Sequence, residues 1–288
     1  MILVTGANGA FGRLVVDHLL TRLPAAEIAV SVRDPGRSAD LAGRGITVRR
    51  ADFDDPAALA RALDGADTVL INGTNYGTEP ARRRRQHAAA IDAVRSAAAK
   101  RLVITSYQDL SHCPMPAVAD FPGTEARAMA GGTAATILRL SSVLDAVVAR
   151  DVRWAMASDA LVAPAGRARI TPAAPSDLAE ATARVLREPG HEGMTYELSG
   201  PDAIGWDDLA ALAAELSGRD LRYRPAADDE YRAFALGLGF PEQALGMLLD
   251  YYAALRAGWA DAATGDLARL LGRPPTASID AVRQALAR

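Results

Sequence analysis

The chain has 288 residues, 50% hydrophobic and 23% charged, with a formal net charge of −3. This composition is typical of a globular protein and suits one large α/β domain. The small acidic excess argues against nucleic acid as the main partner, because binding to phosphates requires an excess of Lys and Arg. One cysteine, Cys113, excludes an intrachain disulfide and a Cys-x-x-Cys metal site. We therefore expect a cytoplasmic protein without a metal centre.

Short β-branched runs alternate with longer alanine-rich amphipathic stretches through the first half of the chain. No apolar run approaches the roughly 20 residues needed to span a bilayer, and the first residues do not resemble a signal peptide, so we expect no membrane association. The periodicity predicts strands at 1–5, 27–32, 46–50, 68–71, 102–105 and 134–140, and helices at 11–23, 38–42, 55–65, 79–99 and 125–130. This alternation predicts a Rossmann-type, doubly wound parallel sheet with helices on both faces.

The alternation weakens in the second half of the chain. Helices are expected at 175–187 and 206–216, a strand at 195–198, and a mostly helical segment from 228 onward. Because no polar linker separates the halves, we interpret 1–150 as the dinucleotide-binding part and 151–288 as a small, mostly helical substrate-binding part of one continuous domain. The apolar residues between 234 and 252 favour a core or a homodimer surface over a roof for a hydrophobic substrate. The basic run Arg82–Arg85 is interpreted as the solvated face of an exposed helix.

A glycine-rich turn joins the first strand to the first helix. The stretch Gly6-Ala7-Asn8-Gly9-Ala10-Phe11-Gly12 places glycines where the backbone must turn tightly and approach a pyrophosphate closely. The N-terminus of the following helix supplies free N–H groups and a positive dipole to an anion. The context predicts a nucleotide site, with a ligand-free tight turn as the alternative.

The end of the second strand bears on the choice between NADP(H) and NAD(H). An NAD site would place an acidic residue there for the ribose hydroxyls, but the chain has Arg33, with Arg37 one helical turn later. Two guanidinium groups suit a 2′-phosphate. Asp34 is the counter-evidence, although it lies one position late for the ribose. The pattern favours NADP(H).

Three further strand ends are expected to line the cofactor. Asp52 and Phe53 follow the third strand, where they could flank the adenine, or Asp52 could cap the next helix instead. Asn72, Gly73 and Thr74 follow the fourth strand and are expected over the ribose and phosphates, with a bare loop as the alternative. Thr105 and Ser106 end the fifth strand, at the carboxyl edge where ligands bind.

These stretches resemble the NmrA-like branch of atypical short-chain dehydrogenases, and within it the type 2 NAD(P)H:quinone oxidoreductases. The resemblance covers nearly the whole chain. It implies NADPH bound at the sheet edge and hydride transfer to a quinone or similar conjugated carbonyl. The segments that carry it are 6–12, 32–35 with Arg37, 45–49, 51–55, 190–198 and 267–274.

The chain departs from the family at the catalytic positions. Short-chain dehydrogenases use Tyr-x-x-x-Lys to protonate a carbonyl oxygen, but none of the seven tyrosines has a lysine four residues later, and Lys100 begins the fifth strand. Arg127 lies nearest the place where relatives carry a lysine, and Ser141 follows the sixth strand. Tyr107, just past the fifth strand, is the remaining candidate proton donor, or an aromatic group that closes the cleft.

The sequence therefore predicts an NADPH-dependent oxidoreductase that acts on a small hydrophobic quinone, enone or related conjugated carbonyl. Tyr107 or water would supply the proton, and Arg127 and Ser141 would shape the pocket. Two alternatives remain: an NADP(H)-binding redox sensor without turnover, and a biosynthetic enzyme that uses the fold for non-redox chemistry.

Overall fold

A computed structural model describes residues 1–74, 78–141 and 147–287 of the chain. Its contacts divide the chain into two compact units. The first comprises 1–107, 118–140 and 175–196, and the second comprises 108–117, 141–174 and 197–288. The chain therefore passes between the units several times, rather than dividing once at residue 150 as the sequence suggested. The segment 175–196 belongs with the sheet because its helix packs there, as described below.

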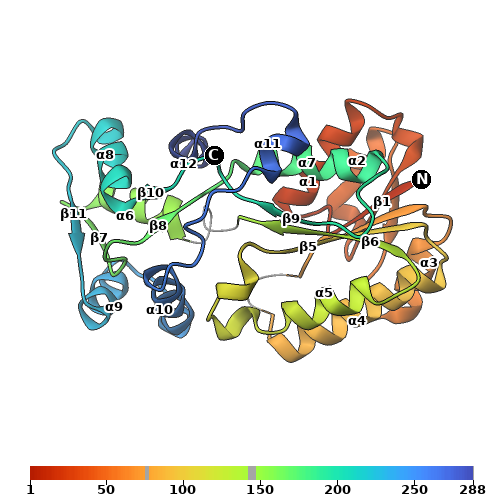
Figure 1. The fold of residues 1–288 in the computed structure, drawn as a ribbon, viewed down its shortest axis with the longest axis horizontal. Coiled ribbons are helices and arrows are strands. Elements are labelled where there is room, and N and C mark those ends of the chain that lie inside the picture. Colours follow the sequence, from red (N-terminus) through yellow and green to blue (C-terminus); the bar gives the residue numbers. More distant parts are fainter. Residues whose placement is uncertain (75–77, 142–146, 288) are drawn as a thin grey trace. The chain divides into compact units, whose positions relative to one another are not determined.

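The first unit is built on a seven-stranded parallel sheet with strand order β3-β2-β1-β4-β5-β6-β9 (Figure 1). This arrangement confirms the predicted Rossmann-type fold. β1 is buried at every residue, as expected of a strand covered on both faces. The strands, in spatial order, are Thr47–Arg50 (β3), Ile28–Val32 (β2), Ile2–Thr5 (β1), Thr68–Ile71 (β4), Arg101–Tyr107 (β5), Ala134–Leu140 (β6) and Thr195–Leu198 (β9).

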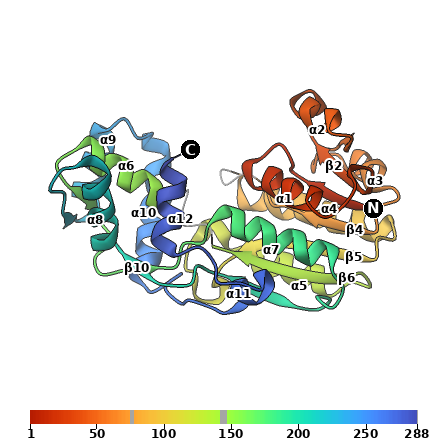
Figure 2. The same ribbon diagram turned by 90° about the horizontal axis from the view of Figure 1, so that it is seen from above.

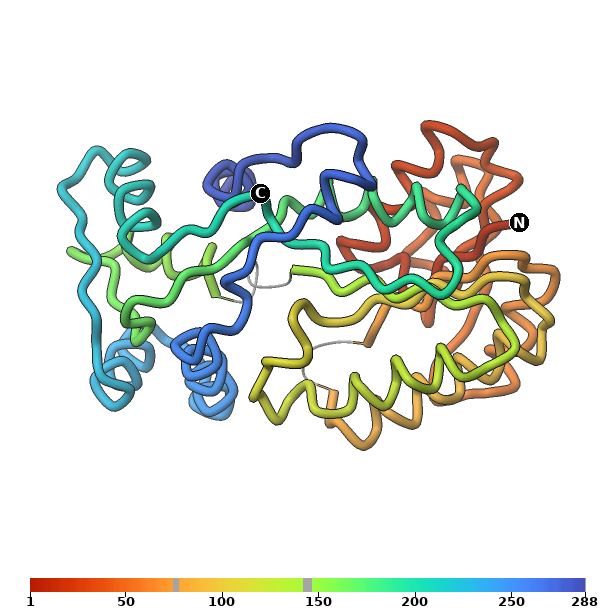
Figure 3. The backbone as a smooth tube through the Cα atoms, viewed as in Figure 1, coloured from red at the N-terminus to blue at the C-terminus, as the bar shows by residue number. Residues whose placement is uncertain are grey.

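Helices cover both faces of this sheet, as Figures 1 and 2 show. On one face α3 (Pro56–Leu63), α4 (Pro80–Ser96) and α5 (Phe121–Met129) bury an apolar core against the strands. On the other face α1 (Ala10–Leu20) packs against α7 (Pro175–Arg187), and the short α2 (Ala39–Gly43) precedes β3. The chain trace in Figure 3 follows α7 as it returns to lie beside α1.

Local sequence determines where two of these helices begin. Asp55 caps α3 by accepting from the amide of Ala58 at 2.9 Å, with Pro56 at the first helical position. Glu79 caps α4 in the same way, accepting from the amides of Ala81 and Arg82 at 3.0 Å each. The start of a third helix, α5, differs from the prediction, because α5 begins at Phe121 rather than near residue 125. Pro122 in its first turn is compatible with a helix start, although an interior proline would not be.

The second unit contains α6 and α8 to α12 with two small two-stranded sheets. Its helices agree with the expected helical character, but its short strands were not predicted, since strands of two or three residues carry no detectable periodicity. Its elements are α6 (Ala149–Ala157), β7 (Leu161–Ala163), β8 (Arg169–Ile170), β10 (Ile204–Gly205), α8 (Trp206–Ser217), β11 (Tyr223–Pro225), α9 (Asp228–Gly237), α10 (Glu242–Arg256), α11 (Asp266–Leu271) and α12 (Ser278–Leu286).

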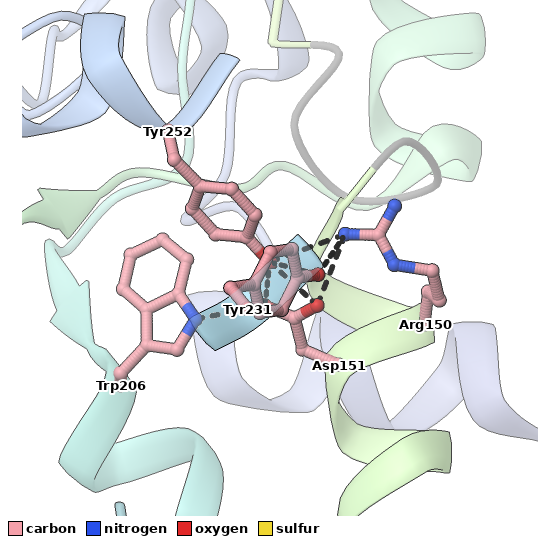
Figure 4. Close-up of polar contacts among 5 residues, drawn as sticks. All are labelled: Arg150, Asp151, Trp206, Tyr231 and Tyr252. Carbon is pink, nitrogen blue, oxygen red and sulfur yellow. Dashed lines mark hydrogen bonds and ion pairs between the residues drawn. The ribbon is translucent and has the colours of Figure 1, made fainter. Parts of the chain in front are cut away.

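A buried polar network joins four helices of the second unit (Figure 4). The Asp151 carboxylate on α6 accepts from the Tyr252 hydroxyl on α10 at 2.6 Å and from Trp206 Nε1 on α8 at 2.8 Å. Arg150 pairs with the same carboxylate at 3.0 Å, and Tyr231 on α9 contacts the Tyr252 hydroxyl at 3.0 Å. Much of the predicted apolar stripe thus forms core: Tyr252 and Leu245 are fully buried, whereas Leu236, Leu238 and Met247 remain exposed.

Among the described residues, no helix is long and apolar enough to cross a membrane.

Candidate cofactor and active site

The glycine-rich turn has the geometry of a nucleotide site. Gly6 adopts φ +67°, a left-handed conformation that glycine allows without strain. A Cβ atom on Gly12 would lie 2.7 Å from the Gly6 carbonyl oxygen, so α1 can approach the turn only because this residue has no side chain. No side chain caps α1 at Gly9. The amides of Ala10 and Phe11, in the first turn of α1, are therefore left for an anion.

Asn8 connects this turn to the loop after β2. Its side-chain amide donates to the Asp34 carbonyl at 3.1 Å, and its amide oxygen accepts from the Ser38 hydroxyl. Asn8 was predicted as a cofactor-binding residue, and in the structure its side chain holds the two loops together. It thereby fixes the position of Arg33 and Arg37 relative to the glycine turn.

The two arginines after β2 are exposed and available. Within the described ranges, neither the Arg33 nor the Arg37 guanidinium has a hydrogen-bond or ion-pair partner, whereas 17 other arginines form ion pairs. Arg13 on α1 orients their loop by donating to the Arg37 carbonyl at 2.8 Å. Unpaired guanidinium groups beside a helix N-terminus form a site for a dianionic phosphate.

Asp34 was the counter-evidence to NADP(H), and its side chain has a structural partner. One carboxylate oxygen accepts from the Gly36 amide at 3.0 Å, which caps the short helical turn that begins at Pro35. A carboxylate in this role stabilises the loop that carries Arg33 and Arg37. Asp34 therefore does not argue against NADP(H), because its carboxylate caps the loop.

The residues after β3 play partly structural roles. Asp52 accepts from the Asp54 amide at 3.1 Å, so one of its oxygens closes a local turn. Phe53 is half-buried and packs against the core beneath the sheet. Asp54 binds two residues of α4, Arg82 and Gln86. This loop is thus held in a defined conformation beside the place expected for the adenine.

Hydrogen bonds tie the carboxyl ends of β1, β4 and β5 together. The Asn72 amide donates to Thr5 Oγ1 at 2.9 Å, and the Gly73 amide donates to Thr105 Oγ1 at 3.0 Å. The Thr105 hydroxyl in turn lies 3.5 Å from Asn72 Oδ1. Thr105 therefore uses its hydroxyl to fix the strand ends, whereas Thr74 Oγ1 and Ser106 Oγ are buried without a partner among the described residues.

A buried ion pair fixes the start of α5 beside this edge. Arg83 donates through Nε to Asp120 Oδ2 at 3.0 Å, and the two side chains are 4% and 2% exposed. The Arg83 guanidinium also lies 4.9 Å from the centre of the Phe121 ring. The expectation of a uniformly solvated basic run is thus wrong at Arg83, which faces the sheet while Arg82, Arg84 and Arg85 are exposed. The sequence shows no signal that separates Arg83 from its neighbours, since its acidic partner is 37 residues away.

Tyr107 ends β5 next to this ion pair. Its ring meets Phe121 edge-on at 4.9 Å between centroids, and it is partly exposed. It therefore lies at the carboxyl edge, as the sequence predicted, with its ring held by an aromatic neighbour.

His87 on α4 was not recognised in the sequence. It is fully buried, contacts Phe121 edge-on at 5.8 Å, and has no hydrogen-bond partner at either ring nitrogen among the described residues. Burial lowers the pKa of His87 to about 4, so the imidazole is neutral near pH 7. Its place on the inner face of α4, three residues before Ala90 and four before Ile91, was the available signal.

The other two candidate catalytic residues, Arg127 and Ser141, have structural partners. Arg127, in the last turn of α5, pairs with Asp92 near the end of α4 at 2.6 Å. Both helices run opposite to the strands, so their ends lie toward the amino edge of the sheet. Ser141 belongs to the second unit, where its buried hydroxyl donates to the Thr171 carbonyl at 3.0 Å. Arg127 is therefore left out of the proposed site, whereas Ser141 directly follows β6 at the carboxyl edge and its role in the pocket stays a prediction.

Comparison with known proteins agrees with this geometry. The sequence profile of the NAD(P)H-binding family matches residues 6–189. Quinone oxidoreductase 2 of Escherichia coli is 32% identical over 282 residues, covering 98% of this chain and 97% of that protein. The crystal structure of the E. coli NADPH-dependent quinone oxidoreductase complexed with NADPH has a TM-score of 0.91 at 31% identity, over 99% of both chains. Citrobacter sp. triphenylmethane reductase complexed with NADP(H) has a TM-score of 0.94 at 31% identity, over 99% of this chain and 100% of that chain.

Proposed function

The chain belongs to the NAD(P)H-binding family, as the sequence resemblance indicated, and we propose that it is an NADPH-dependent reductase of small conjugated carbonyl compounds such as quinones and enones. The single observation that carries the choice of cofactor is the pair of guanidinium groups of Arg33 and Arg37, which have no partner among the described residues and lie in the loop that Asn8 ties to the start of α1.

The residues of the first unit have complementary roles in this proposal. Gly6, Gly9 and Gly12 let the backbone approach the pyrophosphate, and the first amides of α1 bind it. Arg33 and Arg37 bind the 2′-phosphate.

Asn72, Gly73, Thr74 and Ser106 lie at the ends of β4 and β5, where the ribose and the reacting ring are expected. The orphaned hydroxyls of Thr74 and Ser106 fit a ligand that carries several hydroxyl groups.

The reduced nicotinamide supplies the hydride when bound. Tyr107 is proposed to face the acceptor and donate its phenolic proton to the reduced oxygen, with water restoring that proton afterwards. A quinone needs little help from a general acid, because its aromatic ring stabilises the anion that forms. A site without the Tyr-Lys pair is therefore compatible with this substrate class.

The relatives support the reaction class. Quinone oxidoreductase 2 is a quinone reductase by name, and the Citrobacter protein reduces triphenylmethane dyes. Both names describe reduction of extended conjugated systems, which agrees with an acceptor of this class for the present chain. The proposed acceptor is correspondingly a flat, hydrophobic, conjugated molecule.

The test is to titrate the purified protein with NADPH and NADH by fluorescence, then to follow NADPH absorbance with a panel of quinones and enones. Tighter binding of NADPH with oxidation of the cofactor would support the reductase. Tight binding without turnover of any acceptor would instead favour the sensor alternative, and failure to bind either cofactor would refute the proposal.

A further inference from the structure

Three side chains near the ends of β4 and β5 carry buried polar atoms without a hydrogen-bond partner among the described residues. They are His87, Ser106 and Thr74, and within the described part of the chain neither nitrogen of His87 nor either hydroxyl oxygen makes a hydrogen bond. Buried polar groups in native proteins are nearly always paired, so such a group requires a specific explanation.

The alternation of the strands places His87 and Ser106 in the same layer. Leu102 and Ile104 of β5 belong to the apolar core shared with α4, so Ser106, two residues further, faces the same side. His87 lies on the face of α4 that carries Ala90, Ile91 and Val94 into this core. Both polar groups therefore lie between the sheet and α4, where this apolar layer reaches the carboxyl edge.

Gly73 leaves the imidazole accessible from that edge. Its position continues the inward alternation of Val69 and Ile71 on β4, but it carries no side chain. A Cβ atom built on Gly73 would lie 3.9 Å from His87 Nε2 and 3.7 Å from Thr105 Oγ1. Nε2 is thus directed at the space that any other residue at this position would fill.

The imidazole is uncharged and has no acidic partner. Burial is the largest cause of its lowered pKa, and the nearby Arg83 guanidinium acts in the same direction. The Asp120 carboxylate acts in the opposite direction, but it is already bound to Arg83 through two nitrogens. A neutral imidazole can donate through one nitrogen and accept through the other.

We propose that His87, with the hydroxyls of Ser106 and Thr74, forms a hydrogen-bonding subsite that binds an oxygen of the ligand at the ends of β4 and β5. The subsite rests on the proposed reductase function and adds a residue to it. The ligand group is a hydroxyl or carbonyl oxygen, supplied either by the ribose of the cofactor or by the acceptor. The unmade hydrogen bonds of the free protein are then completed on binding.

The chain has four histidines, which makes the imidazole directly observable. We would label the full-length protein with ¹⁵N-histidine, assign His87 by its loss in His87→Gln, and record the ring nitrogen shifts. The free protein should show a neutral His87 ring at pH 7. NADP⁺ is added first and 1,4-naphthoquinone second. A change in the His87 ring shifts with NADP⁺ alone would identify the ribose as the source, and a change that requires naphthoquinone would identify the acceptor.

His87 ring shifts that stay unchanged through both additions, while fluorescence shows NADP⁺ bound, would overturn the subsite and leave the proposed function intact. Absence of NADP⁺ binding would overturn the proposed function and the subsite with it. His112 is an internal control, because it is exposed and bonded to Asp109, and its signals should not respond.

Gly73→Ala provides a second, independent test. The backbone of Gly73 is not left-handed and the new methyl group would make ordinary contacts, so the fold should tolerate it. The methyl group would cover Nε2, and we expect NADP⁺ or naphthoquinone to bind at least tenfold more weakly with a reduced His87 response. Gly123→Ala, where a Cβ meets open space, is the matched control and should bind like the wild type. An unchanged affinity and an unchanged response in Gly73→Ala would contradict the proposal.

Discussion

The protein contains two buried polar clusters that differ in how they are satisfied. In the second unit, both oxygens of Asp151 accept hydrogen bonds, from Tyr252, Trp206 and Arg150. In the first unit, both ring nitrogens of His87 and the hydroxyl oxygens of Ser106 and Thr74 are buried without partners among the described residues. A buried carboxylate with both oxygens bonded stabilises the fold and specifies the arrangement of the helices around it, whereas unpaired groups at a ligand-binding edge are available for binding. We therefore expect the Asp151 network to contribute to stability, and the cluster of His87, Ser106 and Thr74 to contribute to ligand binding.

The largest effect is expected from breaking the network around Asp151. Asp151→Ala leaves the Arg150 guanidinium, the Tyr252 hydroxyl and the Trp206 N–H without their acceptor in a buried environment. The free energy of unfolding should fall by about 3–5 kcal/mol, measured by urea denaturation. Asp159→Ala, which removes an exposed partner of Arg219, should change it by less than about 1 kcal/mol. Equal effects of the two substitutions would contradict the assignment of stability to this network.

The second effect is a dependence of stability on pH that comes from His87. Its pKa in the folded protein is about 4, below the ordinary value of 6.5, so the unfolded chain binds a proton that the folded protein does not. The contribution is fully present above pH 6.5 and is lost as the pH falls towards 4. The difference corresponds to roughly 3 kcal/mol.

Urea denaturation of the wild type and of His87→Gln at a series of pH values measures the contribution of His87 to the free energy of unfolding. The difference between the two proteins should change by about that amount between pH 6.5 and 4, since all other titrating groups are shared. Parallel pH profiles would show that His87 is not a buried neutral residue.

A third prediction concerns the exposed and unpaired charge at Arg33. Arg33→Ala should weaken NADPH binding by roughly 10- to 100-fold, corresponding to about 1.4–2.7 kcal/mol, with NADH affinity nearly unchanged. Arg22→Ala removes another exposed arginine of the first unit and should affect neither cofactor. Fluorescence titration measures both affinities, and an equal loss for NADPH and NADH would argue against a 2′-phosphate site.

The smallest effects are expected from removing a single hydroxyl group, which should lower stability in the Asp151 network and lower ligand affinity in the cluster of His87, Ser106 and Thr74. Tyr252→Phe removes hydroxyl contacts from the Asp151 network, and we expect a loss of about 1–2 kcal/mol in the free energy of unfolding. Ser106→Ala removes a buried hydroxyl that has no partner in the described part of the chain, so stability should stay within about 0.5 kcal/mol or increase, while ligand affinity decreases. Thermal unfolding and NADP⁺ titration distinguish the effects of the two substitutions. A large destabilisation by Ser106→Ala would show that Ser106 stabilises the fold and would contradict its assignment to ligand binding.

The sequence by itself determined the features that depend on neighbouring residues. Apolar runs and helical periodicity located the strands and helices of the sheet, because each pattern is confined to a few turns or strand residues. The glycines from Gly6 to Gly12 identified the nucleotide turn, because only glycine permits that close approach. Arg33 and Arg37 predicted a site for a 2′-phosphate from their place after a strand.

Tertiary structure alone decided which polar groups are paired. Arg83 is one of four consecutive arginines, yet it is buried in an ion pair with Asp120. The same packing buries His87, which has no hydrogen-bond partner among the residues that the structure describes. Arg127 was expected near the reaction, but its pairing with Asp92 depends on how α4 and α5 pack. The return of α7 to the sheet is equally invisible in local patterns. Burial and partner choice depend on contacts between residues far apart in the chain, and no periodicity within one element contains that information.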